Sequence, residues 1–508
     1  MPTACAALPV ASATTSTNGG SDMPRHLPVI YLARAVLEAV TPLSISTGSP
    51  DGAFDSALVR DANALPTIPA TSLAGCLRQL WREIPDVTDV DTLFGFQDGD
   101  DGTPSRLAVS WGALLDSRGR PAEGLLLSGE AERLQDPLFA KALATLDAPD
   151  YRNRVRLGHR GAAADTGKFD RVVLPAGNRF AVELRLHAPA DDPGTDWDAL
   201  LALLAHPGLR LGGASRAGLG RIRCVELHQG RFMLSVRDQT QAFLGLGRGL
   251  DDYAGLEPET LAHAGVDGWL TGRLTLRPRG LWRFGQGNAD LEDRSDKAAD
   301  LLPVTEEQVI WNGNRGERTG RMLLIPASSI KGALAHRMAF HANRFAGSWA
   351  DPDSDAPAEP ELPAAVSALL GEIKGNTDAD EPAERVGCLF IDDAFIAIDP
   401  SAIARLMHNA IDRFTGGVRD RVLYEEQSLL GGTLAIDIAL DQRRLTDRDG
   451  ADAARRAFEA AIDDLCRGRL ALGSRTTTGN GFCDGELTGP LADWLIATRT
   501  SQPIEEAV

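Results

Sequence analysis

The chain has 508 residues, of which 43% are hydrophobic, so it is long enough for about three domains with apolar cores. No apolar run of about 18 residues occurs, which argues against a membrane span. The formal net charge is −19, from 71 acidic and 52 basic residues, which argues against a nucleic-acid partner unless the basic side chains gather on one face. Six scattered cysteines without CxxC spacing argue against structural zinc and a disulfide framework and fit a reducing cytoplasm.

The first predicted elements follow a small, polar N-terminal tail (1–26) that lacks the features of a secretion signal. The stretch "PVIYLARAVLEAV" alternates at period two and predicts a half-buried strand. The stretch "IPATSLAGCLRQL" then predicts a helix, with Ser72 as a favourable N-cap. The apolar side chains on one face of this helix are Leu73, Cys76, Leu77, Leu80 and Trp81.

Three further landmarks complete a first unit. The first is "LFGFQDGDDGTPSRLAVSWGALL", a short apolar-glycine signal followed by an acidic loop and a strand. The second is "NRVRLGHRG", which leads into the strand "LPAGNRFAVELRL". A helix, "DWDALLALLAHPG", then precedes the third landmark, the glycine-rich "LRLGGASRAGLGRIRC". We expect residues 229–267 to form a connector with a short strand and turns.

All these landmarks return in the same order in the second half of the chain. They are "IPASSIKGALAHR", "LLGEIKGNTDADEPAERVGCLFIDDAFI", "NAIDRFTGG" before "LLGGTLAIDIAL", and "LALGSRTTTGNGFCDG" after a second predicted helix. Ser329 again suits an N-cap, and one helix face carries Ile330, Ala333, Leu334 and Met338. Four matches in order indicate a duplicated unit.

The repeat predicts five segments. They are the 1–26 tail, a first unit at 27–228, the 229–267 connector, a second unit at 268–490 and a 491–508 tail that begins as a helix. Each unit reads as strand, helix, strands, helix and glycine-rich element. This order predicts the α+β class, with a mainly antiparallel sheet and helices packed on one side.

The repeated motifs allow two interpretations. In the structural one, Pro ends a strand, Ser caps a helix, and the glycine-rich elements are tight turns. In the functional one, backbone N–H groups at the helix start bind an anion such as RNA phosphate, helped by Arg78, Lys331 and Arg337. The glycines would then let the backbone approach a ligand beside Arg216 and Arg475.

Other kinds of site have little support in the sequence. The glycine-rich elements fit neither the GxGxxG nor the Walker pattern, and no HExxH or GxSxG motif occurs. His336 and His341 lack the spacing of two metal ligands on one helix face, so we expect them to be packing or surface residues.

One stretch resembles a known family. "LSISTGSPDGAFDSALVRDANALPTIPATSLAGCLR" is similar to the signature of the RAMP superfamily and, more narrowly, to the backbone subunit of type III CRISPR effector complexes. "RVRLGHRGAAADTGKFDR" resembles the thumb hairpin of that family, and "LGGASRAGLGRI" its glycine-rich loop. The second unit resembles it too, but the "VRD" triplet is missing and the region before Ile325 is longer. The signature residues retained in the first unit are Asp55, Arg60, Asp61, Pro66, Pro69, Ser72, Leu73, Gly75 and Arg78.

The resemblance implies two tandem ferredoxin-like, RRM-like domains with insertions and thumb hairpins, similar to the fused backbone proteins of type III-D-like systems. The implied partners are a CRISPR guide RNA, a complementary target RNA and other effector subunits, with no membrane. The implied reaction is target cleavage with Mg²⁺ or another divalent metal. The catalytic and metal-binding residues would be Asp55 and Asp300, with Asp290, Asp293 and Asp296 as alternatives in the second unit.

The motifs and the resemblance together also predict RNA contacts. The candidates are Ser72, Arg78, Arg154, Lys168, Gly212, Gly213, Arg216, Gly218, Ser329, Lys331, Arg337, Arg413, Gly473, Ser474, Arg475 and Gly479. Two alternatives stay open. One is an RNA-binding scaffold with one or both catalytic sites inactive. The other is a guide-processing nuclease with a histidine base, for which only His408 lies at a recurrent motif position.

Overall fold

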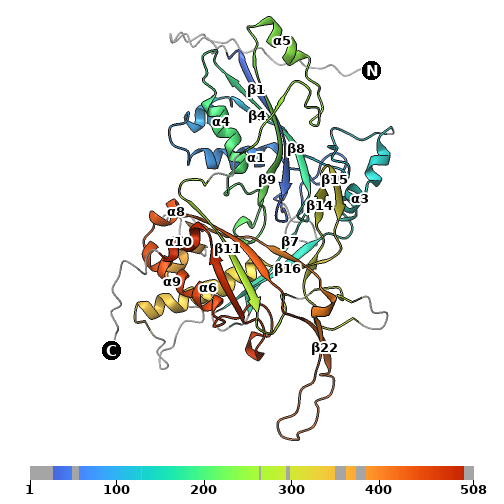
Figure 1. Cartoon of the computed structure of the whole chain (residues 1–508), viewed down its shortest axis with the longest axis vertical. Helices are drawn as coiled ribbons and strands as arrows, with labels where there is room; N and C mark the ends of the chain where they lie inside the picture. Colours follow the sequence, from blue (N-terminus) through green and yellow to red (C-terminus); the bar gives the residue numbers. More distant parts are fainter. Residues whose placement is uncertain are drawn as a thin grey trace, which may run out of the picture.

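The computed structural model describes residues 27–48, 57–127, 129–158, 161, 163–261, 265–285, 287–292, 298–348, 362–372 and 385–496. Two units follow one another along the longest axis of the molecule, the first in blue to green and the second in yellow to red (Figure 1). Each unit is built on its own antiparallel sheet.

The first unit has a ferredoxin-like sheet. Its strands lie in the order β9-β1-β8-β4, with helix α1 between β1 and β4 in the chain and helix α4 between β8 and β9. This is a βαββαβ unit with antiparallel neighbours throughout. The bounds are β1 Val29–Ala39, α1 Ala70–Trp81, β4 Leu107–Val109, β8 Arg179–Ala188, α4 Thr195–Ala202 and β9 Ile222–Met233.

The second unit repeats this topology. Its strands lie in the order β24-β11-β23-β19, with α6 and α9 at the two helix positions. The tandem ferredoxin-like α+β fold expected from the sequence is therefore confirmed. The bounds are β11 Trp269–Pro278, α6 Ala327–Phe345, β19 Leu389–Ile391, β23 Leu434–Asp441, α9 Ala451–Cys466 and β24 Cys483–Thr488.

The expectation of a half-buried first strand is wrong, because all of β1 is buried. One face packs on α1 and α4 through the main core of the unit. The connector covers the other face, where Leu32 packs with Phe232 and Leu256. Arg34 is buried there as well and pairs with Glu183 at 3.0 Å. The connector contains a helix, α5 (Arg237–Leu244), in addition to the expected short strand, β10 (Glu257–Pro258).

The two repeated helices begin earlier than the sequence suggested. Helix α1 starts at Ala70 behind Pro69, and α6 starts at Ala327 behind Pro326. Ser72 and Ser329 therefore lie inside the first turn, and the predicted N-caps are wrong. Proline suits these positions because its fixed φ leads into the helix. The predicted apolar faces are confirmed, since Leu73, Leu77, Leu80 and Trp81 are buried in α1 and Ile330, Leu334 and Met338 in α6.

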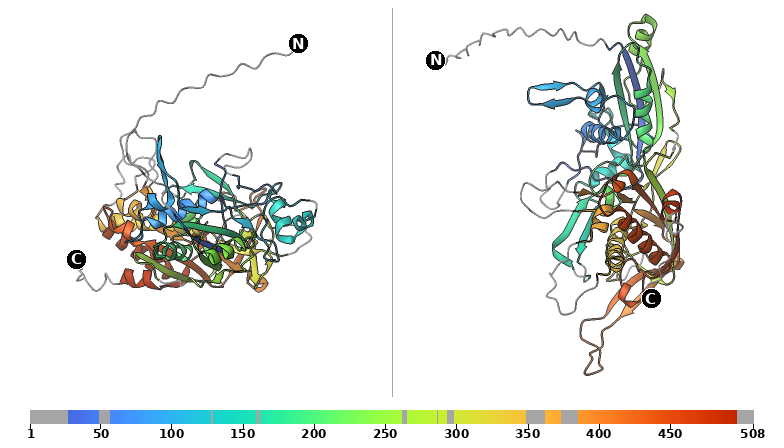
Figure 2. Two further views of the ribbon diagram at one scale, coloured as in Figure 1. Left: turned by 90° about the horizontal axis from the view of Figure 1, so that it is seen from above. Right: turned by 90° about the vertical axis from the view of Figure 1, so that its left-hand side faces the viewer.

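Each unit also carries a thumb hairpin at the predicted place. The first thumb, β6 (Tyr151–Leu157) with β7 (Ala163–Val172), runs alongside the second unit, whereas the second, β21 (Ile403–His408) with β22 (Tyr424–Leu430), projects from the far end (Figure 2). The first thumb thus lies beside the second unit along part of its length, whereas the second thumb projects away from the first unit (Figure 2).

The longer region before Ile325 forms a hairpin, β14 (Val309–Asn312) with β15 (Arg315–Arg318), that reaches back to the first unit. Val309 N donates to the Ala176 carbonyl at 2.9 Å, and Trp311 Nε1 donates to the Gly177 carbonyl at 2.7 Å. This insertion ties the two units together.

The remaining described elements are smaller. The helices are α2 Val90–Phe94, α3 Pro137–Ala144, α7 Ala364–Leu370, α8 Gln442–Thr446 and α10 Pro490–Ile496, and the 3₁₀ turns are Ala131–Gln135, Leu203–Ala205, Ser215–Ala217, Pro400–Ala402 and Thr476–Thr478. The strands are β2 Phe96–Asp98, β3 Asp101–Thr103, β5 Ala113–Leu114, β12 Leu281–Trp282, β13 Thr305–Glu306, β16 Met322–Ile325, β17 Gly371–Glu372, β18 Arg385–Val386 and β20 Ala394–Ala397.

In the part of the chain that the structure describes, no helix has the length and apolarity needed to cross a bilayer. The five described cysteines are unpaired. His341 is buried and bonded to Asp464 at 2.7 Å, whereas His336 lies on the surface, as the sequence indicated.

Candidate RNA interface

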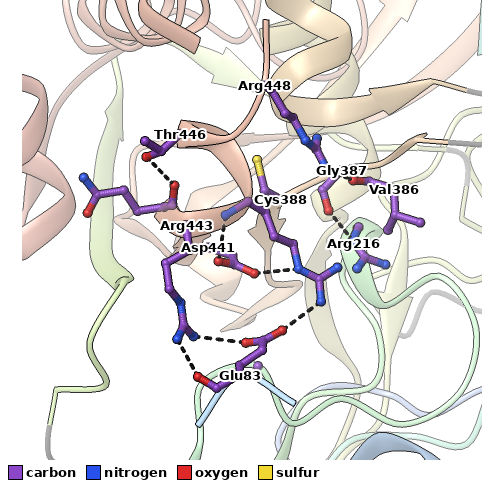
Figure 3. A network of polar contacts seen from close by, with 12 residues as sticks. Glu83, Arg216, Val386, Gly387, Cys388, Asp441, Arg443, Thr446 and Arg448 are labelled. Carbon is purple, nitrogen blue, oxygen red and sulfur yellow. Dashed lines mark hydrogen bonds and ion pairs between the residues drawn. The ribbon is translucent and has the colours of Figure 1, made fainter. Parts of the chain in front are cut away.

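The glycine-rich loop of the first unit (209–221) seats on the second unit. Asp393 N donates to the Gly218 carbonyl. Arg216 Nε donates to the Gly387 carbonyl at 2.5 Å (Figure 3). The Phe390 ring lies 5.0 Å from the Arg216 guanidinium. The first glycine-rich element is therefore part of a junction between the units.

Ion pairs hold the two sides of this junction. Arg210 and Arg221 of the first unit both bond to Asp392 of the second, and Arg221 also reaches Asp437 at 2.9 Å. Glu83 pairs with Arg443 at 3.1 Å and with Arg444 at 2.8 Å. Figure 3 shows Glu83 beside Arg443. Because most of these groups are buried or half-buried, their charges are only weakly screened.

Arg152 and Asp393 form another buried pair of the junction. Arg152 stands on the first thumb and bonds to Glu306 and Asp393 of the second unit. Asp393 also accepts a hydrogen bond from Ala327 N at 2.8 Å, so it caps the first turn of α6. The start of this helix is thus occupied by a protein carboxylate, in the place where the sequence suggested an RNA phosphate.

Three predicted RNA-contact residues come together beside this pair: Arg154 from the first thumb, Arg216 from the glycine loop and Lys331 from α6. Within the described part of the chain, each bonds to a backbone carbonyl, Arg154 to Ala217 at 3.1 Å, Arg216 to Gly387, and Lys331 to Leu370 at 3.5 Å. Among the described residues, none of the three pairs with a carboxylate within ion-pair distance. We call this group the junction cations.

The environment disfavours the charge on all three junction cations. Burial, with the positive charges of Arg216 and Arg154, lowers the pKa of Lys331 to about 8. Burial and neighbouring arginines lower the pKa of Arg216 to about 10. Burial also lowers the pKa of Arg154, although the Asp393 carboxylate opposes this. Cations that share a site without enough anionic charge would gain from a bound anion.

Asp55 lies outside the described residues, in the segment 49–56. The two ends of that segment meet, because Thr47 N donates to the Ala57 carbonyl at 3.2 Å. The base of the segment adjoins the glycine loop, since Gly213 N donates to the Ser44 carbonyl at 2.8 Å.

The "VRD" residues that follow the Asp55 segment have structural roles. Arg60 donates to the Ala64 carbonyl at 2.8 Å and to Thr145 Oγ1 at 2.9 Å. Asp61 Oδ1 accepts from Asn63 N and Leu65 N. These bonds fix the turn between the Asp55 segment and α1.

In the second unit, Asp300 and Asp290 have different surroundings. Asp300 is exposed, and its Oδ2 accepts a hydrogen bond from Glu425 N of the thumb at 2.9 Å. Asp290 pairs with Arg405 and accepts hydrogen bonds from Glu292 N and Gln427 Nε2. Burial opposes ionisation of Asp290, but these bonds outweigh it and lower its pKa. Asp293 and Asp296 lie outside the described residues.

The glycine loop of the second unit has the backbone of the first. Ala214 and Arg475 occupy the same left-handed position, with φ values of 56° and 59°. Arg475 donates to Tyr424 Oη at 2.8 Å and lies 3.4 Å from buried Glu426. His408 is hydrogen-bonded to the same Glu426 at 3.0 Å, so it belongs to this network.

Most of the glycines permit close approach to protein. A Cβ on Gly212 would overlap the Ser44 carbonyl, and a Cβ on Gly473 the Arg283 carbonyl. A Cβ on Gly213 would overlap the Arg171 side chain, and a Cβ on Gly218 would overlap the Asp393 carboxylate. A Cβ on Gly479 would meet nothing within 4 Å. Ser474 N donates to the same Arg283 carbonyl as part of this packing.

The other candidates are dispersed. Arg78 bonds to Asp91 and the Gly95 carbonyl, and Arg337 pairs with Asp464 at 2.6 Å. Both arginines thus have protein partners that the sequence did not indicate. The remaining side chains are exposed or half-buried: Ser72, Lys168, Ser329 and Arg413. Ser329 lies two residues before Lys331 in α6, and Lys168 pairs across the first thumb with Val155, the neighbour of Arg154.

The sequence analysis missed the acceptors of the junction, Asp392 and Asp393, and the arginines Arg210 and Arg221. A signal was present, because the strand landmark reads "LAVSWGA" in the first unit and "LFIDDAF" in the second. A difference in charge between the two units at equivalent positions of the repeat would have indicated the surface where the units meet. Within the described residues, no three His, Cys, Asp or Glu side chains gather as a metal site.

The fold and the junction define a protein of two tandem ferredoxin-like domains with a cluster of cations at the junction, none of which forms an ion pair with a described carboxylate. The chain belongs to the RAMP superfamily, whose family model matches residues 36–223 and 262–484, one region in each unit. A search of curated proteins gives no match. RAMP proteins bind RNA within CRISPR complexes.

Proposed function

We propose that this chain is a guide-RNA-binding backbone subunit of a type III CRISPR ribonucleoprotein, in which two fused backbone units cleave complementary target RNA in antiviral defence. The units would be residues 27–228 and 268–490, joined by the connector. Each would hold a stretch of guide RNA by its phosphates while the bases pair with target RNA.

The observation that carries this proposal is the group of junction cations. Arg154, Arg216 and Lys331 come from three separate elements and both units, and their pKa values are lowered by burial. An RNA phosphate would supply the negative charge that the described carboxylates do not. Phosphate contacts provide most of the affinity in sequence-independent RNA binding.

For the reaction, we propose that Asp55 and Asp300 each act beside one target linkage. The 2′-oxygen would lose its proton to water and attack the adjacent phosphorus, while the 5′-oxygen leaves and takes up a proton from water. The carboxylate would orient the 2′-hydroxyl, and the thumb would hold the linkage in line. A divalent ion, when bound, would neutralise charge on the phosphate.

Asp300 is compatible with one ligand position of such an ion. It is an exposed carboxylate, and Mg²⁺ in proteins often takes one or two carboxylates and completes its shell with water and phosphate oxygens. Asp290 is less suitable, because its oxygens already accept from Arg405 and three other donors.

A scaffold with an inactive second unit is the competing proposal. It is favoured by one observation: in place of a "VRD" turn, the second unit carries the β14–β15 hairpin, which docks on the first unit through Trp311. A segment used for this docking need not retain a catalytic loop.

The test is binding of a guide-length RNA by the purified chain at several salt concentrations. The triple variant Arg154→Ala/Arg216→Ala/Lys331→Ala should bind more weakly, and its log–log salt slope should be shallower by about 0.7 for each phosphate that the variant no longer neutralises. A matched control is Arg315→Ala, which removes one exposed cation of the β14–β15 hairpin. Equal affinity and slope in the triple variant and the wild type would refute the role of the junction cations.

A further inference from the structure

The two units have the same backbone fold. Each residue of the junction therefore has a counterpart in the other unit, on a face that is not part of the junction. The glycine loops align because Gly212 and Gly473 face equivalent carbonyls, and Ala214 matches Arg475. By this alignment, Arg210 corresponds to Ala471 and Arg221 to Phe482.

The acceptor side aligns equally well. Ser110 N donates to the Glu183 carbonyl at 2.9 Å, and Asp392 N donates to the Asp437 carbonyl at 2.9 Å. Ser110 therefore corresponds to Asp392, and the next residue, Trp111, to Asp393. We call Ser110 and Trp111 the free acceptor face, and Ala471, Gly479 and Phe482 the free loop face.

The charges that join the units are absent from both free faces. Ala471 and Phe482 stand where the junction has Arg210 and Arg221, and Ser110 and Trp111 stand where it has Asp392 and Asp393. Glu183 matches Asp437 but is already paired with Arg34 at 3.0 Å and Arg185 at 2.7 Å. A second copy docked in the junction geometry would form none of these ion pairs.

Sterics also oppose such a copy. In the junction, Gly218 lies against Asp393 with no room even for a Cβ. Trp111 puts an indole where Asp393 has a carboxylate, and its side chain would occupy the space of the incoming Gly479 loop. Trp111 is 56% exposed in this chain.

We propose that the free acceptor face binds the glycine-loop face of a different polypeptide, one that offers an apolar seat for Trp111, and that the chain does not assemble with itself. Exposed tryptophans are frequent anchors of protein interfaces. The inference rests on the proposed function for the existence of neighbouring subunits. The choice of a different polypeptide over a second copy follows from the mismatch between the two free faces.

The first experiment places a photo-crosslinking amino acid at position 111 in the complex assembled on guide RNA. The expected product joins position 111 to a peptide of another polypeptide. A crosslink to residues 471–482 of a second copy, or no protein crosslink in an assembled complex, would overturn the proposal. Because the readout is a protein–protein adduct, its failure is distinguishable from loss of RNA binding or cleavage.

The second experiment uses the RNA-free full chain and sedimentation velocity. Wild type should stay monomeric, as should the acceptor variant Ser110→Asp/Trp111→Asp and the loop variant Ala471→Arg/Phe482→Arg, each alone. Mixing the two variants should give a salt-sensitive heterodimer, because the junction charges are then restored.

A mixture of the loop variant with Ser110→Arg/Trp111→Arg should remain monomeric and serves as the control. Self-association of the wild type that Trp111→Ala abolishes would overturn the proposal. Failure of the correctly folded charge variants to dimerise would refute the correspondence between the free faces and the junction.

Discussion

Gly218 of the first unit lies against Asp393 of the second so closely that a Cβ on Gly218 would overlap the Asp393 carboxylate. Its counterpart Gly479 has a similar left-handed φ, 98° against 107°, but open space around it. Both Gly→Ala substitutions should cost about 1 kcal/mol from backbone strain. Gly218→Ala should cost clearly more, because the junction must open.

Denaturant unfolding of the two variants checks this prediction, and Gly479→Ala serves as the matched control for backbone strain. Equal losses of unfolding free energy would mean that Gly218 and Asp393 do not touch in solution.

Removing the Arg152 cation from its buried ion pairs should lower the free energy of unfolding. Arg152→Met leaves Asp393 and Glu306 buried without their partner, which should destabilise the fold by about 3–5 kcal/mol. The double variant Arg152→Met/Asp393→Asn should lose less than the sum of the single losses, since Asn can still accept from Ala327 N.

The measurement for this pair is a thermal or denaturant double-mutant cycle. Arg223→Met is a suitable control, because Arg223 is half exposed and its pair with Glu38 should contribute less than about 1 kcal/mol. Additive losses across the cycle would contradict a direct Arg152–Asp393 interaction.

Lys331 should make RNA binding pH-dependent. Its pKa of about 8 means that the ammonium is lost between pH 7 and 9, so RNA affinity should fall over that interval, by at most about tenfold per pH unit for one linked proton. Lys331→Arg keeps its charge and should flatten the profile. An unchanged profile in Lys331→Arg would show that another group carries the dependence.

The same pKa shift predicts a stability change in the RNA-free protein. The fold lowers the pKa of Lys331 from 10.5, so the unfolded chain holds this proton more tightly. Below pH 8 both states are protonated and the buried charge destabilises the fold in full. This destabilisation should disappear as the pH rises from about 8 to above 10.5, and comparison of the unfolding free energies of wild type and Lys331→Met across that range measures it.

The products of target cleavage can distinguish the roles of Asp55, Asp300 and Asp290. With guide-loaded complex and Mg²⁺, Asp55→Ala and Asp300→Ala should each remove one distinct product, and the double variant should remove both. Asp290→Asn should lower the thermal midpoint through loss of its Arg405 pair and leave the products unchanged.

Two outcomes would revise this assignment. Unchanged products in all variants would leave the chain as a scaffold. Loss of a product in Asp290→Asn at unchanged stability, with Asp300→Ala fully active, would move the second site to Asp290.

The sequence by itself determined the duplication, the α+β order of strands and helices and the apolar faces of α1 and α6, while the family resemblance implied the ferredoxin-like topology. These features depend on local periodicity and on motif order, which need no knowledge of distant contacts. It also included Arg154, Arg216 and Lys331 among sixteen RNA-contact candidates, but it could not separate them from Arg78 and Arg337, which have carboxylate partners.

Only the tertiary structure decided which charges meet. The pairs Arg152–Asp393 and Arg221–Asp437 join residues from different units, and the connector buries the second face of β1 by packing from outside the sheet. A net charge of −19 also concealed three clustered cations without an ion-pair partner among the described residues, because a sum over the chain carries no positions. Long-range packing sets the partner and burial of each ionisable group, and these in turn decide whether a cation is a structural tie or is left to bind an anion.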